Sequence, residues 1–244
     1  MAVALEIAVQ DPEGVAAAVA GGADRIELCT ALALGGLTPS AALVRAAVAA
    51  GLPVHVLVRP RAGGFEYSAV ELAVILDDVR RALDLGAHGV VVGGVRGERI
   101  DTSLVEQVRA LAGSAEVTFH RAFDTLTDLE PALEVLAGLG VDRVLTSGGA
   151  SRVADGLAQL ERLVERADGR LQVMAGSGID ASTVRAVVAT GVAAVHASAK
   201  RTVVEASRVD LGSLAQAGSS ARQATDEAAV RALRTALDEV GRTS

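Results

Sequence analysis

Short runs rich in Val, Ile and Leu alternate with longer Ala- and Leu-rich stretches along most of the chain. The longer stretches place apolar residues near the helical period of 3.6, which predicts amphipathic helices between strands. This alternation predicts repeated βα units and a parallel sheet. The strand candidates are Leu5–Val9, Arg25–Cys29, Val54–Arg59, Gly89–Gly93, Val117–His120, Arg143–Thr146, Leu171–Met174 and Ala194–Ala197, and the helix candidates include Val70–Leu85, Leu104–Leu111, Leu129–Leu139, Leu157–Ala167 and Ala181–Val188.

About eight such units in 244 residues match the size of a (β/α)₈ barrel. We therefore predict an α/β fold, a single TIM-type barrel domain over residues 1–244. Its barrel core covers about 3–201, followed by a loop over 202–225 and a C-terminal helix over 226–241. The main rival is an open doubly wound sheet, but the first turn lacks a Gly-x-Gly-x-x-Gly phosphate fingerprint.

Polar residues share one face of several predicted strands, because side chains alternate between the two faces of a strand. In a closed barrel the apolar face packs on helices, so the polar face lines the interior and its mouth. Burying ionisable groups costs free energy, and their convergence is therefore a hypothesis for a functional site. The residues of this lining are Glu6, Arg25, Glu27, Cys29, His55, Arg59, Thr118, His120, Gln172, His196 and Ser198.

Catalytic groups of such barrels lie at the C-terminal ends of the strands. His120 ends its strand and precedes Arg121 and Asp124, which could orient a ring or a bound anion, so it is the first catalytic candidate. Arg59 also qualifies by position. Glu6 and Glu27 lie nearer mid-strand, where a buried ion pair is as plausible as catalysis. For His55 a hydrogen-bonded core role is the stronger reading.

Glycine-rich turns follow two late strands and suggest an anion site. Gly148 follows one strand, and Gly176, Ser177 and Gly178 follow the next, before a helix expected to begin near Ile179. Backbone N–H groups at a helix start attract phosphate, and Ser198 and Lys200 could complete the pocket. The alternative is that these glycines only turn the chain. A Schiff-base role for Lys200 is disfavoured, because it lies beyond the strand.

The loop 59–68 combines arginines, glycines and two of the few aromatic residues of the chain. One interpretation is a lid that brings Arg61 over an anionic ligand, at which Arg59 could also act. The other is a cap on the barrel rim, with Phe65 and Tyr67 packed against it.

Charge and cysteine content narrow the function. A net charge of −7 and a pI near 5.2 argue against nucleic acid as a partner. One cysteine excludes an intramolecular disulfide and favours the reducing cytoplasm. We see no signal peptide and no apolar run long enough for a membrane span. The sequence leaves a homo-oligomer such as a dimer open.

Several of these motifs resemble the CutC family of copper-homeostasis proteins, and the likeness extends to about Arg201. The resemblance implies a TIM-type barrel, a cytoplasmic location and a link to copper as ligand. The matching stretches are Leu5-Glu6, Gly21–Cys29, Gly35–Ser40, Pro53–Val56, Arg59–Arg61, Val117–Asp124, Asp142–Gly148, Gly176–Ile179 and His196–Ala199.

Three departures from the family pattern remove groups near the site. Family members often carry a cysteine after the first-strand Glu, and some carry one after the last-strand His; this chain has Ala8 and Ala197 at these positions. The arginine loop of the family often has an Asp after its glycines, where this chain has Gly64. Cu(I) prefers sulfur ligands, so Cys29 is a weak Cu(I) candidate with few partners. We therefore carry two hypotheses. One is a CutC-like copper-homeostasis protein. The other is a barrel enzyme performing acid–base chemistry of the lyase or isomerase type on a small anionic metabolite, with phosphorylated metabolites among the candidates.

Overall fold

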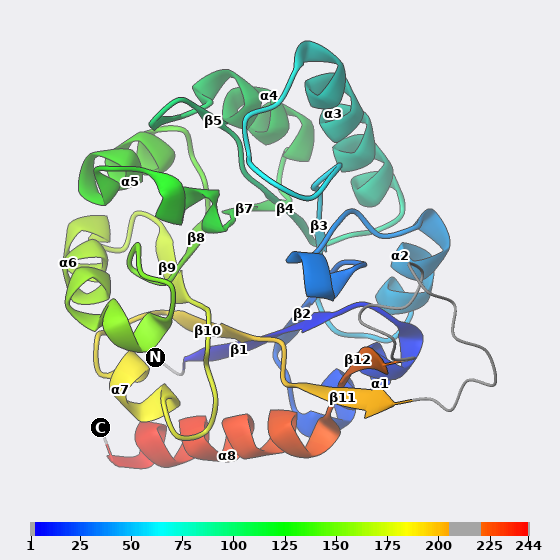
Figure 1. Cartoon of the computed structure of the whole chain (residues 1–244), viewed down its shortest axis with the longest axis vertical. Coiled ribbons are helices and arrows are strands. Elements are labelled where there is room, and N and C mark those ends of the chain that lie inside the picture. Colours follow the sequence, from blue (N-terminus) through cyan, green and yellow to red (C-terminus); the bar gives the residue numbers. More distant parts are fainter. Residues whose placement is uncertain (1–2, 205–220, 244) are drawn as a thin grey trace.

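A closed barrel of eight parallel strands forms the centre of the computed structural model, and helices surround it (Figure 1). The structure describes residues 3–204 and 221–243. The strands follow one another around the barrel in chain order, and β1 closes the ring by pairing with β10. The predicted (β/α)₈ fold is thereby confirmed. The barrel strands are β1 (Ala4–Val9), β2 (Arg25–Leu28), β3 (Val54–Leu57), β4 (Gly89–Val92), β7 (Glu116–Phe119), β8 (Arg143–Thr146), β9 (Gln172–Ala175) and β10 (Ala194–Ala197).

The helices bury their apolar stripes against the outer face of this barrel. Local signals fix their ends: Asp11 caps the first helix, and Ser68 with Glu71 forms a capping box on the third. The outer face of the strands supplies Leu5, Ile7 and Ile26 to this core. The helices are α1 (Pro12–Gly21), α2 (Ala41–Val48), α3 (Ala69–Asp84), α4 (Thr102–Ala112), α5 (Leu129–Gly138), α6 (Leu157–Ala167), α7 (Val184–Val188) and α8 (Glu227–Thr243), with 3₁₀ turns η1 (Leu32–Leu34), η2 (Arg121–Thr125) and η3 (Val153–Asp155).

Two elements differ from the sequence prediction. The segment 202–225, predicted as a loop, contains parts of β11 (Lys200–Val204) and β12 (Ala221–Thr225), which pair antiparallel; residues 205–220 lie outside the described part. The helix predicted from Ala181 begins at Val184 instead, because the Asp180 carboxylate accepts the N–H groups of Ser182 and Thr183 in a preceding turn. A second short hairpin is formed by β5 (Val95–Arg96) and β6 (Arg99–Ile100).

Register determines which polar residues become neighbours inside the barrel. On β1, Glu6 lies level with Arg25 on one side and His196 on the other. On β2, Glu27 lies level with His55. Five ionisable residues thus meet in the same part of the interior. Within the described residues, no helix is both long and apolar enough to cross a membrane.

The last turn of α1 packs closely on α8, and this contact yields a test of the fold. A Cβ on Gly21 would lie 2.5 Å from Val230, so Gly21→Ala must push α8 outward. We expect a loss of about 1–3 kcal/mol in the free energy of unfolding. Gly138 also ends a helix but has open space, so Gly138→Ala should be neutral or stabilise by up to about 1 kcal/mol. Urea unfolding of both variants measures the difference, and equal effects would contradict this packing.

Candidate active site at the barrel mouth

The carboxylate of Glu6 is the centre of a hydrogen-bonded cluster inside the barrel. It is fully buried and accepts hydrogen bonds from Arg25 Nε at 2.6 Å and from His196 Nδ1 at 2.7 Å. The ring of His55 places Nδ1 3.4 Å from the same carboxylate. Burial by itself would raise the pKa of Glu6, but the two histidines and the charge of Arg25 outweigh it and hold that pKa well below its usual range. Glu6 is therefore a fixed negative charge.

Glu27, one strand away, has the opposite electrostatic character. Its side chain is buried and accepts no hydrogen bond from any described residue. Burial raises its pKa, and the nearby charge of His196 only partly offsets this, so the value reaches about 7. Carboxyls poised near neutrality are suited to taking up and releasing protons. Glu27 can therefore act as an acid or a base at physiological pH.

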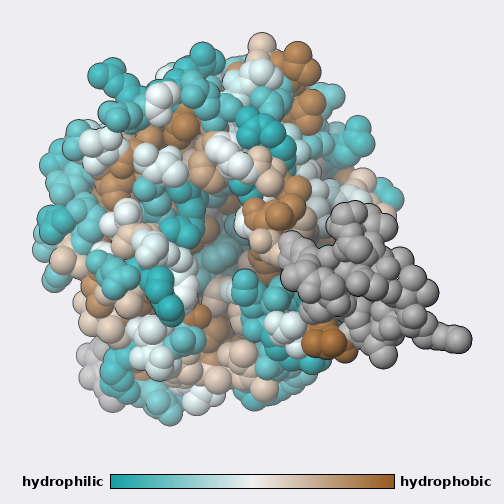
Figure 2. Space-filling view, viewed as in Figure 1, coloured by the Kyte–Doolittle hydropathy of each residue, from teal (hydrophilic) through white to brown (hydrophobic). Residues whose placement is uncertain are grey.

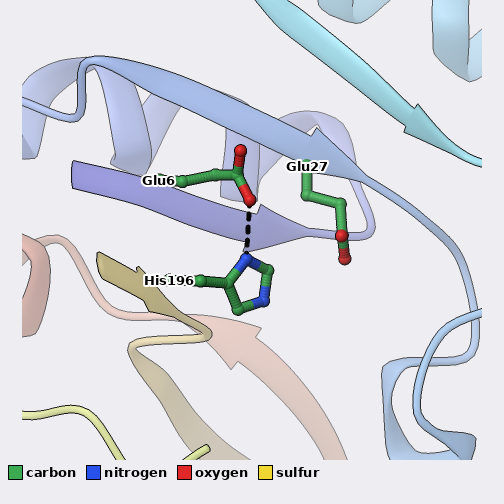
Figure 3. A group of neighbouring side chains, drawn as sticks. All are labelled: Glu6, Glu27 and His196. Carbon is green, nitrogen blue, oxygen red and sulfur yellow. Dashed lines mark hydrogen bonds and ion pairs between the residues drawn. The ribbon is translucent and has the colours of Figure 1, made fainter. Parts of the chain in front are cut away.

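His196 completes an acid–base pair with Glu27. Ligand atoms of Glu6, Glu27 and His196 lie within 4.8 Å of one another, and Figure 3 shows the His196 ring bonded to Glu6 and set beside Glu27. Burial lowers the pKa of His196, but the charge of Glu27 and the bond to Glu6 raise it overall. Because an ionised carboxylate only accepts hydrogen bonds, Nδ1 carries a proton and Nε2 is the atom left for chemistry.

A cavity of about 310 Å³ opens above this pair, at the C-terminal ends of the strands. Its wall combines the ionisable groups with apolar side chains from β3, β8 and η1 and with the loop residue Phe65. The hollow near the centre of the face in Figure 2 is this mouth. Pockets of about 300–1,000 Å³ are typical for small-molecule ligands. The lining residues are Glu27, Leu32, Leu34, Gly35, Leu57, Arg59, Phe65, His120, Arg121, Leu145 and His196.

His120 lines the cavity as a neutral hydrogen-bond donor. Burial, together with the charge of Arg59, lowers its pKa to about 3. Its Nδ1 accepts from the N–H of Ala122, so the proton is on Nε2, which has no partner. Arg121 and Asp124 bond to each other and not to this ring. Gly93 makes the ring position possible, because a Cβ there would lie 2.3 Å from Nδ1.

Arg59 brings a buried positive charge to the same cavity. Its guanidinium donates to the carbonyls of Leu34, Gly36 and Gly63 at 2.8–3.0 Å, and it lies over the Phe65 ring. No carboxylate of the described residues forms an ion pair with it. Carbonyl groups accept from its two terminal nitrogens, but its buried Nε has no partner and its charge is uncompensated, which favours an anion in the cavity.

The N–H groups of the turn at Gly148, where the sequence predicts an anion site, are bonded within the protein. The carboxylate of Asp124 occupies that turn, accepting from the N–H groups of Ser147 and Gly149 and from the Thr146 hydroxyl. The N–H of Gly148 donates to Thr146 Oγ1 at 2.9 Å. The protein thus supplies its own anion there, and an external one finds no free donors in this turn.

The turn of Gly176, Ser177 and Gly178 lies beside the cavity, but it does not lead directly into a helix. Gly176 borders the cavity, because a Cβ there would meet Leu145 and His196. Ser177 and Gly178 both have a φ of +81°, but no helix starts at Gly178, contrary to the prediction. Ser198 is half-buried, and Lys200 is exposed in β11 and away from the lining residues.

Arg61 is not among the residues that line the cavity. It pairs with Glu71 at the start of α3, donates to the carbonyls of Gly64 and Glu66, and stacks on Tyr67. The loop therefore caps the barrel rim, and Arg59 and Phe65 are the residues that it contributes to the cavity wall.

The sulfur ligands expected for copper lie apart from one another. Cys29 is fully buried among Leu57, Val91 and Leu32, and burial raises the pKa of its thiol. The sulfur of Met174 accepts from Arg25 Nη2 at 3.1 Å, beside a positive charge that repels a cation. The described residues therefore do not fit a Cu(I) site. Glu6, Glu27 and His196 are close enough for a metal, but both Glu6 oxygens are already bonded to Arg25 and His196.

Sequence reasoning missed two members of the interior cluster, Glu116 and Arg143. The Glu116 carboxylate bonds to His55 at 3.1 Å and to Arg143 at 2.9 Å. Both residues begin barrel strands, and strand parity with Thr118 and Leu145 would have assigned them inward.

Removing the Glu27 charge should change how stability depends on pH. The folded pKa of about 7 exceeds the ordinary value of 4.5, so the wild type loses stability as the pH rises through this window. Glu27→Gln has no such loss and should gain up to about 3 kcal/mol relative to wild type between pH 4 and pH 8. Urea unfolding across this range measures the effect. The exposed Glu161→Gln is the control, and parallel curves for wild type and Glu27→Gln would contradict the assignment.

Comparisons with known proteins place the chain in one family. The model of the CutC family matches residues 3–201. A CutC family protein of Agrobacterium fabrum is 44% identical over 96% of this chain and 93% of its own length, and one of Sinorhizobium medicae is 42% identical over 96% of each chain. A solved CutC structure from Streptococcus agalactiae, named for copper homeostasis, has a TM-score of 0.76 and 29% identity, covering 81% of this chain and 99% of that one. The chain belongs to the CutC family.

Proposed function

We propose that this member of the CutC family is an enzyme that performs acid–base chemistry, of the lyase or isomerase type, on a small anionic metabolite. The observation that carries the proposal is the buried, unbonded carboxyl of Glu27, with a pKa of about 7, on the wall of a cavity lined with charged groups. A purely structural carboxylate would be paired, as Glu6 is. An unpaired one costs free energy that a catalytic role would explain.

The contacts of the ionisable cavity residues suggest a catalytic role for each of Glu27, His196 and His120. Glu27 takes a proton from the substrate or returns one, and His196 Nε2 exchanges the second proton while Glu6 holds the ring in place. His120 donates from its unpartnered Nε2 to a substrate oxygen and, being neutral, does not release that proton. This use of a neutral histidine is one of the known patterns of barrel enzymes.

Arg59 is the proposed partner of the substrate's anionic group. Its charge has no counter-ion among the described residues, and burial strengthens the attraction for an anion. For a phosphorylated metabolite, the turn of Gly176, Ser177 and Gly178 is the proposed phosphate position, together with Ser198 just past β10, because Gly176 borders Leu145 and His196. Gly148 and Lys200 are no longer part of that proposal.

Copper homeostasis is then an indirect consequence of the enzyme's reaction. The family name links the protein to copper, but the sulfur atoms described above do not converge. Any Cu(I) binding would fall to Cys29 alone and would be weak. The single cysteine fits a reducing compartment, and we propose the cytoplasm.

Glu27→Gln should bind substrate without converting it, because the amide keeps the shape of the carboxyl but cannot exchange the proton. Purified protein is incubated with a small-molecule extract of cells, and mass spectrometry follows which anionic metabolites disappear. We expect wild type to consume at least one anionic metabolite, and Glu27→Gln to consume the same metabolite at a rate at least about 100-fold lower. This factor matches the roughly 10²–10⁴-fold contribution of general acid–base catalysis. The variant should instead retain that metabolite on a desalting column.

Glu161→Gln serves as the matched control, since it removes an exposed carboxylate and should behave as wild type. The enzyme proposal is abandoned if wild type and Glu27→Gln leave the extract identical in composition.

Cu(I) affinity is tested by competition with a chromogenic Cu(I) chelator. We expect weak binding that the chelator removes, and a further loss in Cys29→Ser, because that thiol is the one cysteine of the chain. Tight binding that survives Cys29→Ser would show that the ligand argument is mistaken and would favour a direct copper role.

A further inference from the structure

A line of alternating carboxylates and imidazoles runs through the barrel from one end to the other. Glu116 Oε2 lies 3.1 Å from His55 Nε2, His55 Nδ1 lies 3.4 Å from Glu6, and Glu6 bonds His196 Nδ1 at 2.7 Å. Glu116 is the first residue of β7, and its side chain is 46% exposed at the N-terminal end of the barrel. His196 lines the cavity at the other end. The proposed function uses only the mouth half of this line.

His55 must be doubly protonated for both of its contacts to be hydrogen bonds. A neutral imidazole has one donor, whereas both ring nitrogens of His55 face carboxylates, which only accept. Burial opposes the charge, but the bonds to Glu116 and Glu6 outweigh it and raise the pKa of His55. His55 is therefore an imidazolium on a side chain that is 3% exposed.

Glu116 determines whether that imidazolium persists. A single oxygen of Glu116 lies 3.1 Å from His55 Nε2 and 2.9 Å from Arg143 Nη2, so it separates two buried cations. The charge of Arg143 acts against the proton on His55. Without the Glu116 carboxylate, Glu6 alone would oppose the repulsion by Arg143 and the cost of burial, so we expect this proton to be lost more readily.

The charge on His55 acts in turn on the pair at the mouth. It faces Glu6 and, on the adjacent strand, Glu27, whose pKa it lowers. The other charged groups facing the pair are Arg25 on β2, Glu6 on β1 and, from the cavity wall, Arg59 and Arg121. Arg25 is paired with Glu6 at 2.6 Å, whereas His55 is the imidazolium beneath the pair, bonded to Glu116 on its other side.

We propose that Glu116 and His55 are positioning residues, which fix the protonation of the Glu27–His196 pair from the opposite end of the barrel. The proposal rests on the proposed function for the role of that pair. Its physical content is independent of any substrate, because it concerns proton occupancy alone. Glu116 touches neither the cavity nor its lining residues.

The test is an NMR titration of protein labelled with ¹⁵N-histidine and ¹³C-carboxyl glutamate. The chain has four histidines, so their signals can be assigned one by one. In Glu116→Gln we expect His55 to lose its proton at a pH at which wild type keeps it. The acid dissociation constants of Glu27 and His196 should then fall about threefold or more, because the cation beneath them is gone. Glu116→Asp, which keeps the charge, should shift them less.

Two controls separate this effect from a general disturbance. Glu134→Gln removes a half-exposed carboxylate that binds Arg166 and Arg170 on the outside of the barrel, and it should leave both titrations unchanged. In a His55→Gln background, Glu116→Gln should no longer shift His196, because the link is broken. Unchanged titrations in Glu116→Gln, or an equal shift in the His55→Gln background, would overturn the proposal. Either result is independent of the metabolite experiment, so the two proposals can fail separately.

Discussion

A carboxylate with no solvent exposure must be neutralised within the protein, and Glu6 imposes this requirement on the whole interior. Arg25 supplies the permanent counter-charge at 2.6 Å, and the two histidines supply the remaining donors. Four strands, β1, β2, β3 and β10, must keep their register for these contacts to exist. Removing Arg25 or His196 would leave a buried charge partly unpaired, a change that typically costs about 3–5 kcal/mol. The barrel centre is thus held by charge compensation as well as by apolar packing.

Strand parity recovered much of the fold and of the site. Alternation placed Glu6, Glu27 and His196 on one face, and the structure brings them together at the floor of the cavity. Parity failed to include Glu116 because the predicted strand was begun one residue later, at Val117. It says nothing about which buried carboxyl is paired and which is free, since that depends on register between strands.

The anion site shows a different limit of sequence reasoning. A glycine turn after a strand has the composition of a phosphate nest whether or not its N–H groups are free. Asp124 fills the turn at Gly148 from a different βα unit, more than twenty residues earlier in the chain. Such long-range satisfaction of backbone donors has no local signature. In the same way, the Asp180 carboxylate accepts the N–H groups of Ser182 and Thr183, and α7 begins later than predicted. These N–H groups are therefore not available to an external anion.

The Asp124 carboxylate has a consequence for ligand affinity. It holds Thr146, Ser147 and Gly149 and also orients Arg121, so the edge of the mouth has its final shape before any ligand arrives. The conformational entropy of this segment is lost when the chain folds, so ordering it adds no further cost to the free energy of binding. A rigid rim of this kind favours fast recognition of one ligand shape over adaptation to many. Preorganisation, rather than a large contact area, would then let a cavity of about 310 Å³ select a small metabolite.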